Sequence, residues 1–169
     1  MTKGVQKQLS GDPGIRGRKI VIAVDGSANA KYAFRWYLQH SRLPDDGVLF
    51  LHIFEAPSLT AFSLNNLGSM PLEEWKKELR EKVNKVRQLE EDYIAEGRGA
   101  TLNCAFLSKP AEKIGEGIIR TAKDMNANLI IMGTRGPEAA SRALLGSVSE
   151  FVIRQGAVPV TVVPNRNNK

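Results

Sequence analysis

The chain has 169 residues, enough for one ordinary domain, and its 42% hydrophobic and 25% charged residues exclude a wholly disordered protein. A single cysteine, Cys104, excludes an internal disulfide framework and a multi-cysteine zinc site. Two histidines, His40 and His52, make a histidine-rich metal centre a poor hypothesis, and we expect no metal site. No apolar run reaches the ~20 residues that span a bilayer, and the first residues do not read as a secretory leader. We therefore expect a cytoplasmic protein without a membrane partner.

The formal net charge of +6 lies at the two ends of the chain. Residues 1–19 hold five basic side chains and one acidic one, and Arg166 and Lys169 stand near the C-terminus. Residues 20–165 are balanced, whereas a nucleic-acid-binding fold usually carries a basic patch on its folded body. We predict a flexible basic tail over 1–17, one domain over 18–164, a polar tail over 165–169, and no nucleic-acid partner.

Apolar runs alternate along the chain with stretches whose apolar residues recur every three or four positions. The runs are typical of strands buried on both faces of a parallel sheet, and the stretches of amphipathic helices. The alternation predicts an α/β fold, a single doubly wound open five-stranded parallel sheet with helices on both faces, Rossmann-like in class. The predicted strands are 19–24, 48–54, 101–107, 129–132 and 158–163, and the predicted helices are 29–40, 72–96, 111–125 and 147–155.

The connection between the second strand and the second helix differs from the others. Residues 56–70 show no apolar periodicity and predict a long loop, which could be a lid, an interaction segment or a locally disordered stretch. The helix that follows is expected to begin after Pro71 and to stop at Gly97 and Gly99. Its charged face is most simply a solvated surface.

The fourth predicted strand leads into the most informative motif. Gly133-Thr134-Arg135-Gly136 follows the strand directly, and Gly146-Ser147 comes nine residues later at the start of a helix. Glycine lets a backbone approach a ligand closely, and the free N–H groups of a helix start favour an anion. Ser147 and Ser149 could add hydroxyl donors and Arg135 could neutralise a phosphate. The spacing predicts a polyphosphate cradle, although each glycine alone could simply permit a tight turn.

Two other strand ends carry candidate residues, because ligands of such sheets bind beyond the carboxyl ends of the strands. Asp25 could order the turn before the first helix, whose expected N-cap is Ser27, or it could accept hydrogen bonds from a ribose. The backbone of Ile53 could match the edge of a purine, while its side chain reads more simply as core.

The sequence favours binding over catalysis. It lacks both G-x-x-x-x-G-K-S/T and G-x-G-x-x-G, so the usual NTPase lysine and the dinucleotide fingerprint are missing. No general base is evident, since His52 lies inside a predicted strand. We expect no catalytic residue and at most slow ATP hydrolysis. Two alternatives stay open: a slow ATPase, and a dimeric scaffold that acts through protein contacts without nucleotide.

Four stretches of this chain resemble the universal stress protein family: Ile20 to Ser27, Leu51-His52-Ile53, Leu129 to Ser149, and Val158 to Val163. The third carries the family signature G-x2-G-x9-G-S/T, and the resemblance covers residues 18–164. It implies the ATP-binding subclass, with ATP, ADP or AMP bound and Mg²⁺ held through the phosphates. The expected function is a nucleotide-dependent switch in the stress response.

The resemblance also implies a role for individual positions. Ala23 and Asp25 would flank adenine and ribose, the backbone of Ile53 would hydrogen-bond adenine, and Met132 and Gly133 would lie along the nucleoside. A homodimer would form through Val160–Val163, and Ser108 would narrow the ribose side, where the family often has glycine. The phosphates would be held by Gly136, Gly146, Ser147, Val148 and Ser149, with Arg135 beside them.

Overall fold

The computed structural model describes residues 17–55, 72–134 and 145–164, with the backbone alone at 72–75 and 78. Predictions for 1–16, for the loop at 56–71 and for the tail at 165–169 lie outside these residues. Strands and helices alternate as predicted, in the order β1 (Lys19–Ala23), α2 (Ala28–His40), β2 (Gly47–Glu55), α4 (Leu72–Gly99), β3 (Asn103–Ala111), α5 (Ile114–Asp124), β4 (Leu129–Gly133), α6 (Ser147–Gln155) and β5 (Val160–Val163).

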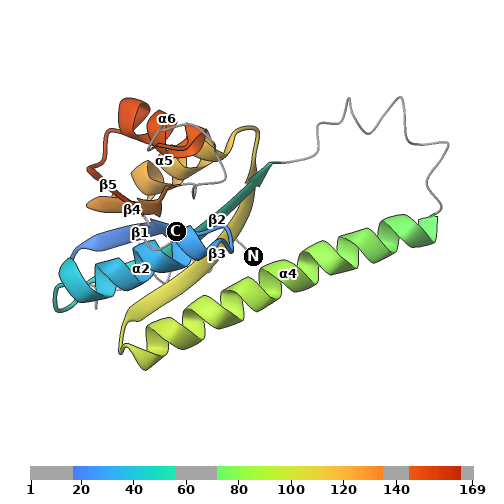
Figure 1. The fold of residues 1–169 in the computed structure, drawn as a ribbon, viewed down its shortest axis with the longest axis horizontal. Helices are drawn as coiled ribbons and strands as arrows, with labels where there is room; N and C mark the ends of the chain where they lie inside the picture. Colours follow the sequence, from blue (N-terminus) through green and yellow to red (C-terminus); the bar gives the residue numbers. More distant parts are fainter. Residues whose placement is uncertain (1–16, 56–71, 135–144, 165–169) are drawn as a thin grey trace.

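The five strands form one parallel sheet in the order β3-β2-β1-β4-β5. Helices α5 and α6 cover one face of this sheet, and α2 and α4 cover the other (Figure 1). The strand order therefore reverses between β1 and β4. This arrangement confirms the predicted doubly wound α/β fold.

Each face of the sheet has its own apolar core. Val21, Leu49 and Ile130 pack with α5 and α6 on one face, whereas Ile22 and Phe50 pack with α2 and α4 on the other. Successive side chains of a strand point to opposite faces, so a strand covered on both sides needs apolar residues at every position. This requirement explains why the strands appear in the sequence as continuous apolar runs.

Strand β3 is longer than the sequence predicted. It does not stop at Leu107 but continues in register with β2 as far as Ala111, with Pro110 opposite Phe54. β3 is an edge strand, and an edge is where a sheet tolerates a proline that cannot donate to the ladder. As a result α5 begins at Ile114, three residues later than expected.

Helix α4 continues past the glycine that was expected to end it. It runs to Gly99, and Gly97 lies within its last turn. A Cβ atom on Gly97 would stand 2.7 Å from the Cys104 sulfur and 3.3 Å from the Phe50 ring. Gly97 therefore allows the helix to approach the sheet closely instead of stopping it.

We expect Gly97→Ala to lower the free energy of unfolding by about 1–3 kcal/mol, because the added methyl group overpacks this contact. Alanine would otherwise be about 1 kcal/mol better than glycine inside a helix. Gly99→Ala is the matched control, since its added methyl group would meet no described atom within 4 Å apart from its chain neighbours and its own helix backbone, and it should be neutral or stabilising. Urea unfolding of both variants measures the difference, and equal effects would contradict this packing.

Arg18, the first residue of the predicted domain, is held by the folded body. Its guanidinium donates to both carboxylate oxygens of Asp46, from Nε at 3.0 Å and from Nη2 at 2.8 Å. Asp46 is only 3% exposed and also accepts from the Tyr37 hydroxyl and the Leu43 amide, both at 2.9 Å. Burial acts to raise the pKa of Asp46, but the hydrogen bonds from Arg18, Leu43 and Tyr37 outweigh it and hold that pKa below its ordinary value.

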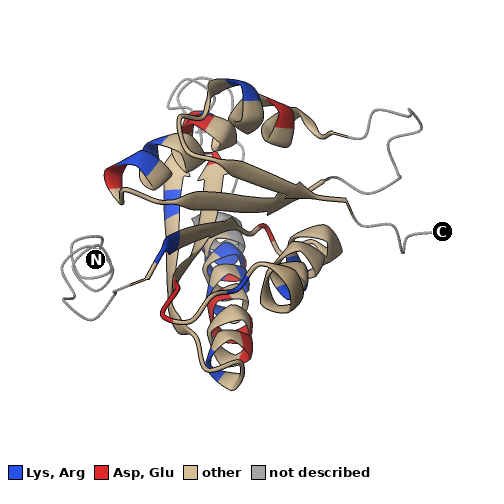
Figure 2. Ribbon diagram, turned by 90° about the vertical axis from the view of Figure 1, so that its left-hand side faces the viewer, with Lys and Arg blue, Asp and Glu red and all other residues tan. Residues whose placement is uncertain are grey.

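The other charges are spread over the outer helices. Figure 2 shows basic and acidic residues interspersed on the helices, with few on the strands between them. Within the described ranges, no helix is long and apolar enough to cross a membrane, and no group of three or more histidine, cysteine, aspartate or glutamate side chains is placed to hold a metal ion.

Asp46→Asn should destabilise the protein by about 1–3 kcal/mol at pH 7, because it removes the charge partner of the half-buried Arg18 and weakens the hydrogen bonds to the buried carboxylate. Since the folded-state pKa of Asp46 lies below its ordinary 3.8, its contribution is complete above pH 3.8 and is lost as the pH falls through the lower folded value. Urea unfolding between pH 7 and pH 2 should show this loss in the wild type and not in the variant. Asp45→Asn is the control, because this exposed neighbour has a φ of 66°, which asparagine tolerates. Asp45→Asn should keep the wild-type stability at pH 7 and the wild-type loss at low pH. A destabilisation at pH 7 as large as that of Asp46→Asn would contradict the assignment.

Candidate functional site

The turn after β1 lies where the strand order reverses. Gly26 has a φ of +80°, which favours glycine, and the Asp25 carboxylate accepts from the Ser27 amide at 2.9 Å. Ser27 is the N-cap of α2, with its hydroxyl accepting from the Ala30 amide at 3.2 Å. Asp25 thus orders the turn, the first of its two predicted roles. Asp25 is also exposed, so its carboxylate is accessible for the second predicted role, accepting hydrogen bonds from a ribose.

The backbone of Ile53 faces a position that β1 does not reach. β1 pairs with β2 only up to Ala23 opposite Leu51, and the Val24 amide then donates to the Leu51 carbonyl at 2.9 Å. In a parallel ladder the backbone groups of successive residues point to alternate neighbours. Leu51 faces β1 and His52 faces β3, so the N–H and C=O of Ile53 point beyond the end of β1. A flat ligand with a donor and an acceptor on one edge could pair with them.

The side chains of Ile53 and Met132 belong to the core. Both are 5% exposed and lie in the cluster under α5 and α6, with the half-buried Ala23 packed against the same cluster. In α5, a Cβ atom on Gly117 would come within 2.8 Å of the Ile53 side chain. Ala23, Ile53 and Met132 therefore lie on one face at the carboxyl edge, where Ile53 and Met132 can offer mainly backbone to a ligand.

Gly133 is held against the first turn of α2. A Cβ atom there would lie 2.6 Å from the carbonyl oxygen of Asn29 and 3.1 Å from the Ala30 amide nitrogen. Both are backbone atoms, which cannot rotate away. Gly133 therefore has a packing reason to be glycine that does not depend on any ligand.

Gly133→Ala should lower the free energy of unfolding by about 1–3 kcal/mol in protein freed of nucleotide, because the helix must move to admit the methyl group. Thermal and urea unfolding of the apo variant measure this. If the apo variant is as stable as the wild type, the close approach to Asn29 is wrong. A loss of ligand affinity in this variant cannot by itself be assigned to a lost ligand contact.

Among the described residues, no side chain caps the start of α6. Gly146 is its N-cap, and the first bond of the helix runs from the Glu150 amide to the Gly146 carbonyl at 2.9 Å. Ser147 is exposed and Val148 is half-buried, whereas Ser149 is buried and donates its hydroxyl to the Gly146 carbonyl at 2.8 Å. With no cap from the described part of the chain, the amide groups of this first turn can bind an anion, because helix starts leave N–H groups without partners inside the helix.

Some predicted positions fall elsewhere. Arg135 and Gly136 lie outside the described residues. His52 sits within β2, with Nδ1 2.9 Å from the Ser108 hydroxyl of β3. Burial lowers the pKa of His52, with an opposing contribution from the Asp25 charge, so its position suits a neutral histidine within the sheet.

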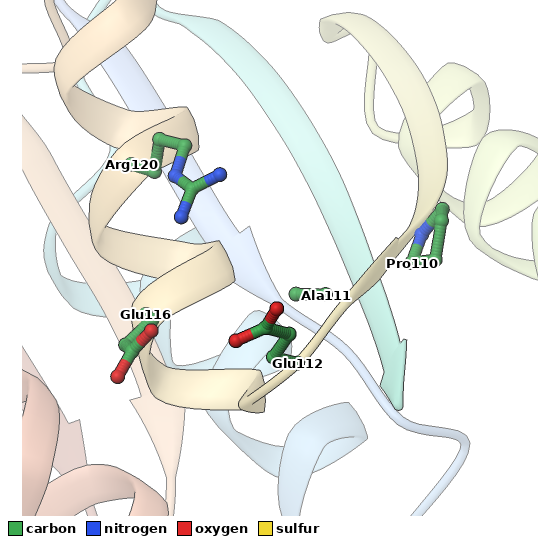
Figure 3. Close-up of a pocket in the computed structure, with 5 residues that line it drawn as sticks. All are labelled: Pro110, Ala111, Glu112, Glu116 and Arg120. Carbon is green, nitrogen blue, oxygen red and sulfur yellow. The ribbon is translucent and has the colours of Figure 1, made fainter. Parts of the chain in front are cut away.

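A hollow that the sequence analysis did not predict lies beside the end of β3 at Ala111. It has a volume of about 320 Å³ and is lined by Pro110, Ala111, Glu112, Glu116 and Arg120 (Figure 3). The Glu116 carboxylate also lies 3.3 Å from the Lys113 ammonium. The hollow shares no residue with the predicted nucleotide site. Had the full length of β3 been predicted, Glu112 would have been recognised as a residue at the end of a strand, where ligands of such sheets bind.

Comparison with known proteins bears on the identity of this fold and site. The universal stress protein family matches residues 17–164. Universal stress protein MJ0577 of Methanocaldococcus jannaschii is 29% identical over 166 residues, which cover 89% of this chain and 97% of the relative. A solved structure of MJ0577 has a TM-score of 0.69 at 26% identity, covering 89% of this chain and 98% of that one.

The chain belongs to the universal stress protein family. It spans about half of one relative, a universal stress protein of Mycolicibacterium smegmatis that is 26% identical over 144 residues, covering 85% of this chain and 47% of that protein. It spans 64% of universal stress protein PHOS32 of Arabidopsis thaliana, which is 28% identical over 164 residues and covers 86% of this chain. The resemblance seen in the sequence is confirmed.

Proposed function

We propose that the chain binds an adenine nucleotide at the carboxyl edge of β1, β2 and β4 and acts as a nucleotide-dependent switch in the stress response of the cytoplasm. The observation that carries the proposal is the first turn of α6, whose amides have no side-chain cap within the described residues and lie at the same edge as the backbone of Ile53. One solved structure with this fold, from Arabidopsis thaliana, holds AMP (TM-score 0.65, 16% identity, 90% of this chain and 94% of that one), and another holds cAMP.

The proposed ligand has three parts that match three elements. The adenine edge pairs with the N–H and C=O of Ile53, beyond the end of β1. The ribose hydroxyls donate to Asp25, whose carboxylate the Ser27 amide already orients. The phosphates lie on the amides of Gly146, Ser147, Val148 and Ser149, with Mg²⁺ bound through the phosphates, and Arg135 and Gly136 complete the contacts.

The proposed role is regulatory and not catalytic. Rapid phosphoryl transfer needs a phosphate lysine and a positioned base, and the sequence offers no motif for either. His52, the histidine nearest this edge along the chain, is paired with Ser108. We therefore propose that hydrolysis is slow at most. The chain is also proposed to form a homodimer through β5, an edge strand in which Val160, Thr161 and Val162 are half-buried and which pairing would protect.

Ser147→Glu tests the phosphate site without disturbing the fold. Ser147 is exposed in the first turn of α6, where an acidic residue suits the helix dipole, so the apo protein should keep its melting temperature. The same carboxylate would repel a bound phosphate, so we expect ATP–Mg²⁺ affinity to fall at least about tenfold in calorimetry. Saturating ATP–Mg²⁺ should raise the melting temperature of the wild type by about 5 °C or more.

Ser147→Gln is the matched control, because it has the same size without the charge and should keep most of the affinity. Adenosine, which has no phosphate, should bind Ser147→Glu as well as it binds the wild type, whereas Asp25→Ala should weaken adenosine and ATP alike. No thermal shift in the wild type would contradict nucleotide binding and favour a scaffold. Fast phosphate release would favour an enzyme.

A further inference from the structure

Helix α4 has one part that packs against the sheet and one part that does not. From Val86 onward its apolar face is covered: Val86 and Leu89 are partly buried against the sheet, and Tyr93 is 2% exposed. Leu79 and Val83, earlier on the same side of the helix, are 47% and 50% exposed. Figure 1 shows this end of α4 running out beyond the sheet. Exposed aliphatic side chains in a row on a projecting helix indicate an interaction surface.

The apolar positions of this projecting part are symmetric in the sequence. Leucine, tryptophan, leucine, valine and valine occupy positions 72, 75, 79, 83 and 86. Counted outward from Leu79 in either direction, the first apolar position is four residues away and the second is three residues further. If two such helices lie antiparallel about a two-fold axis at Leu79, each apolar position of one faces an apolar position of the other. Self-complementarity of this kind is what a two-fold interface between identical chains requires.

The rest of α4 excludes a parallel pair. Beyond Val86 the same face is occupied by the chain's own sheet, so a parallel partner helix on that face would run into the strands. An antiparallel partner meets only positions 72–86, and the midpoint of that range is Leu79. The midpoint of the uncovered part of the helix is therefore the same residue as the centre of the sequence symmetry. Residues 56–70 of the same chain offer no such match, since their sequence lacks helical apolar periodicity.

We propose that positions 72–86 of α4 are a self-association surface, on which a second copy of this chain pairs antiparallel with Leu79 at the two-fold axis. The surface is separate from the β5 edge, so contacts at both would link chains into larger assemblies. Packing from Val86 onward already anchors the helix, and association does not have to nucleate it. The overlap is short, so the contact belongs to the small, concentration-dependent class of interfaces.

Disulfide formation at single positions tests the geometry. In a Cys104→Ala background, which removes the native thiol, Leu79→Cys should form a covalent dimer under mild oxidation, seen on a non-reducing gel. Val83→Cys should form much less, because the two copies of position 83 stand on opposite sides of the axis. Lys77→Cys is the control on the opposite side of the helix and should stay monomeric on the gel. Circular dichroism confirms that each variant folds.

Sedimentation of the full chain gives a second readout. Leu79→Glu should weaken association beyond the proposed β5 dimer at least about tenfold, whereas Lys77→Glu should leave it nearly unchanged. The proposal is overturned if Leu79→Cys does not cross-link, or if Val83→Cys cross-links equally well, as in a parallel or non-specific pair. It is also overturned if Leu79→Glu leaves association unchanged, as expected if the chain itself covers this face.

Discussion

The unequal length of neighbouring strands is the constraint on which the proposed site depends. β1 stops pairing with β2 at Ala23, while β2 and β3 continue side by side to Glu55 and Ala111. The chain leaves β1 through a turn that needs Gly26 and that Asp25 orders. This step in the sheet leaves Ile53 without a strand neighbour on its β1 side, although β3 still pairs with it on the other side. Asp25 lies two residues past the end of β1, at the same edge of the sheet.

The fold was predictable because two-sided burial gives a strong sequence signal. Runs such as Ile20 to Val24 must be apolar at every position, and the stretches between them repeat with a helical period. The ends of elements were less predictable, because tertiary contacts decide them. The third strand was predicted to end at Leu107, yet it continues through Pro110 at the edge of the sheet. Gly97 was predicted to stop a helix, yet it allows the close contact with Cys104 and Phe50.

The candidate site was also predictable only in part. The sequence indicated Asp25, Ile53 and the glycine signature, and all of their described members lie at the carboxyl edge of the sheet. It could not show that Gly133 packs against the Asn29 backbone or that the Ser149 hydroxyl bonds within its own helix. A glycine after a buried strand has the same appearance in a sequence whether a helix or a phosphate comes close to it. Only the position of α2 in the fold separates these causes.

The central claim is tested most directly by amide resonances of the labelled protein recorded with and without ATP–Mg²⁺. The account predicts that the largest shifts, and new protection from hydrogen exchange, fall on the Ile53 amide and on the amides of Ser147 to Ser149. Shifts confined to Glu112, Glu116 and Arg120 around the hollow beside β3, or no shifts at saturating nucleotide, would contradict it.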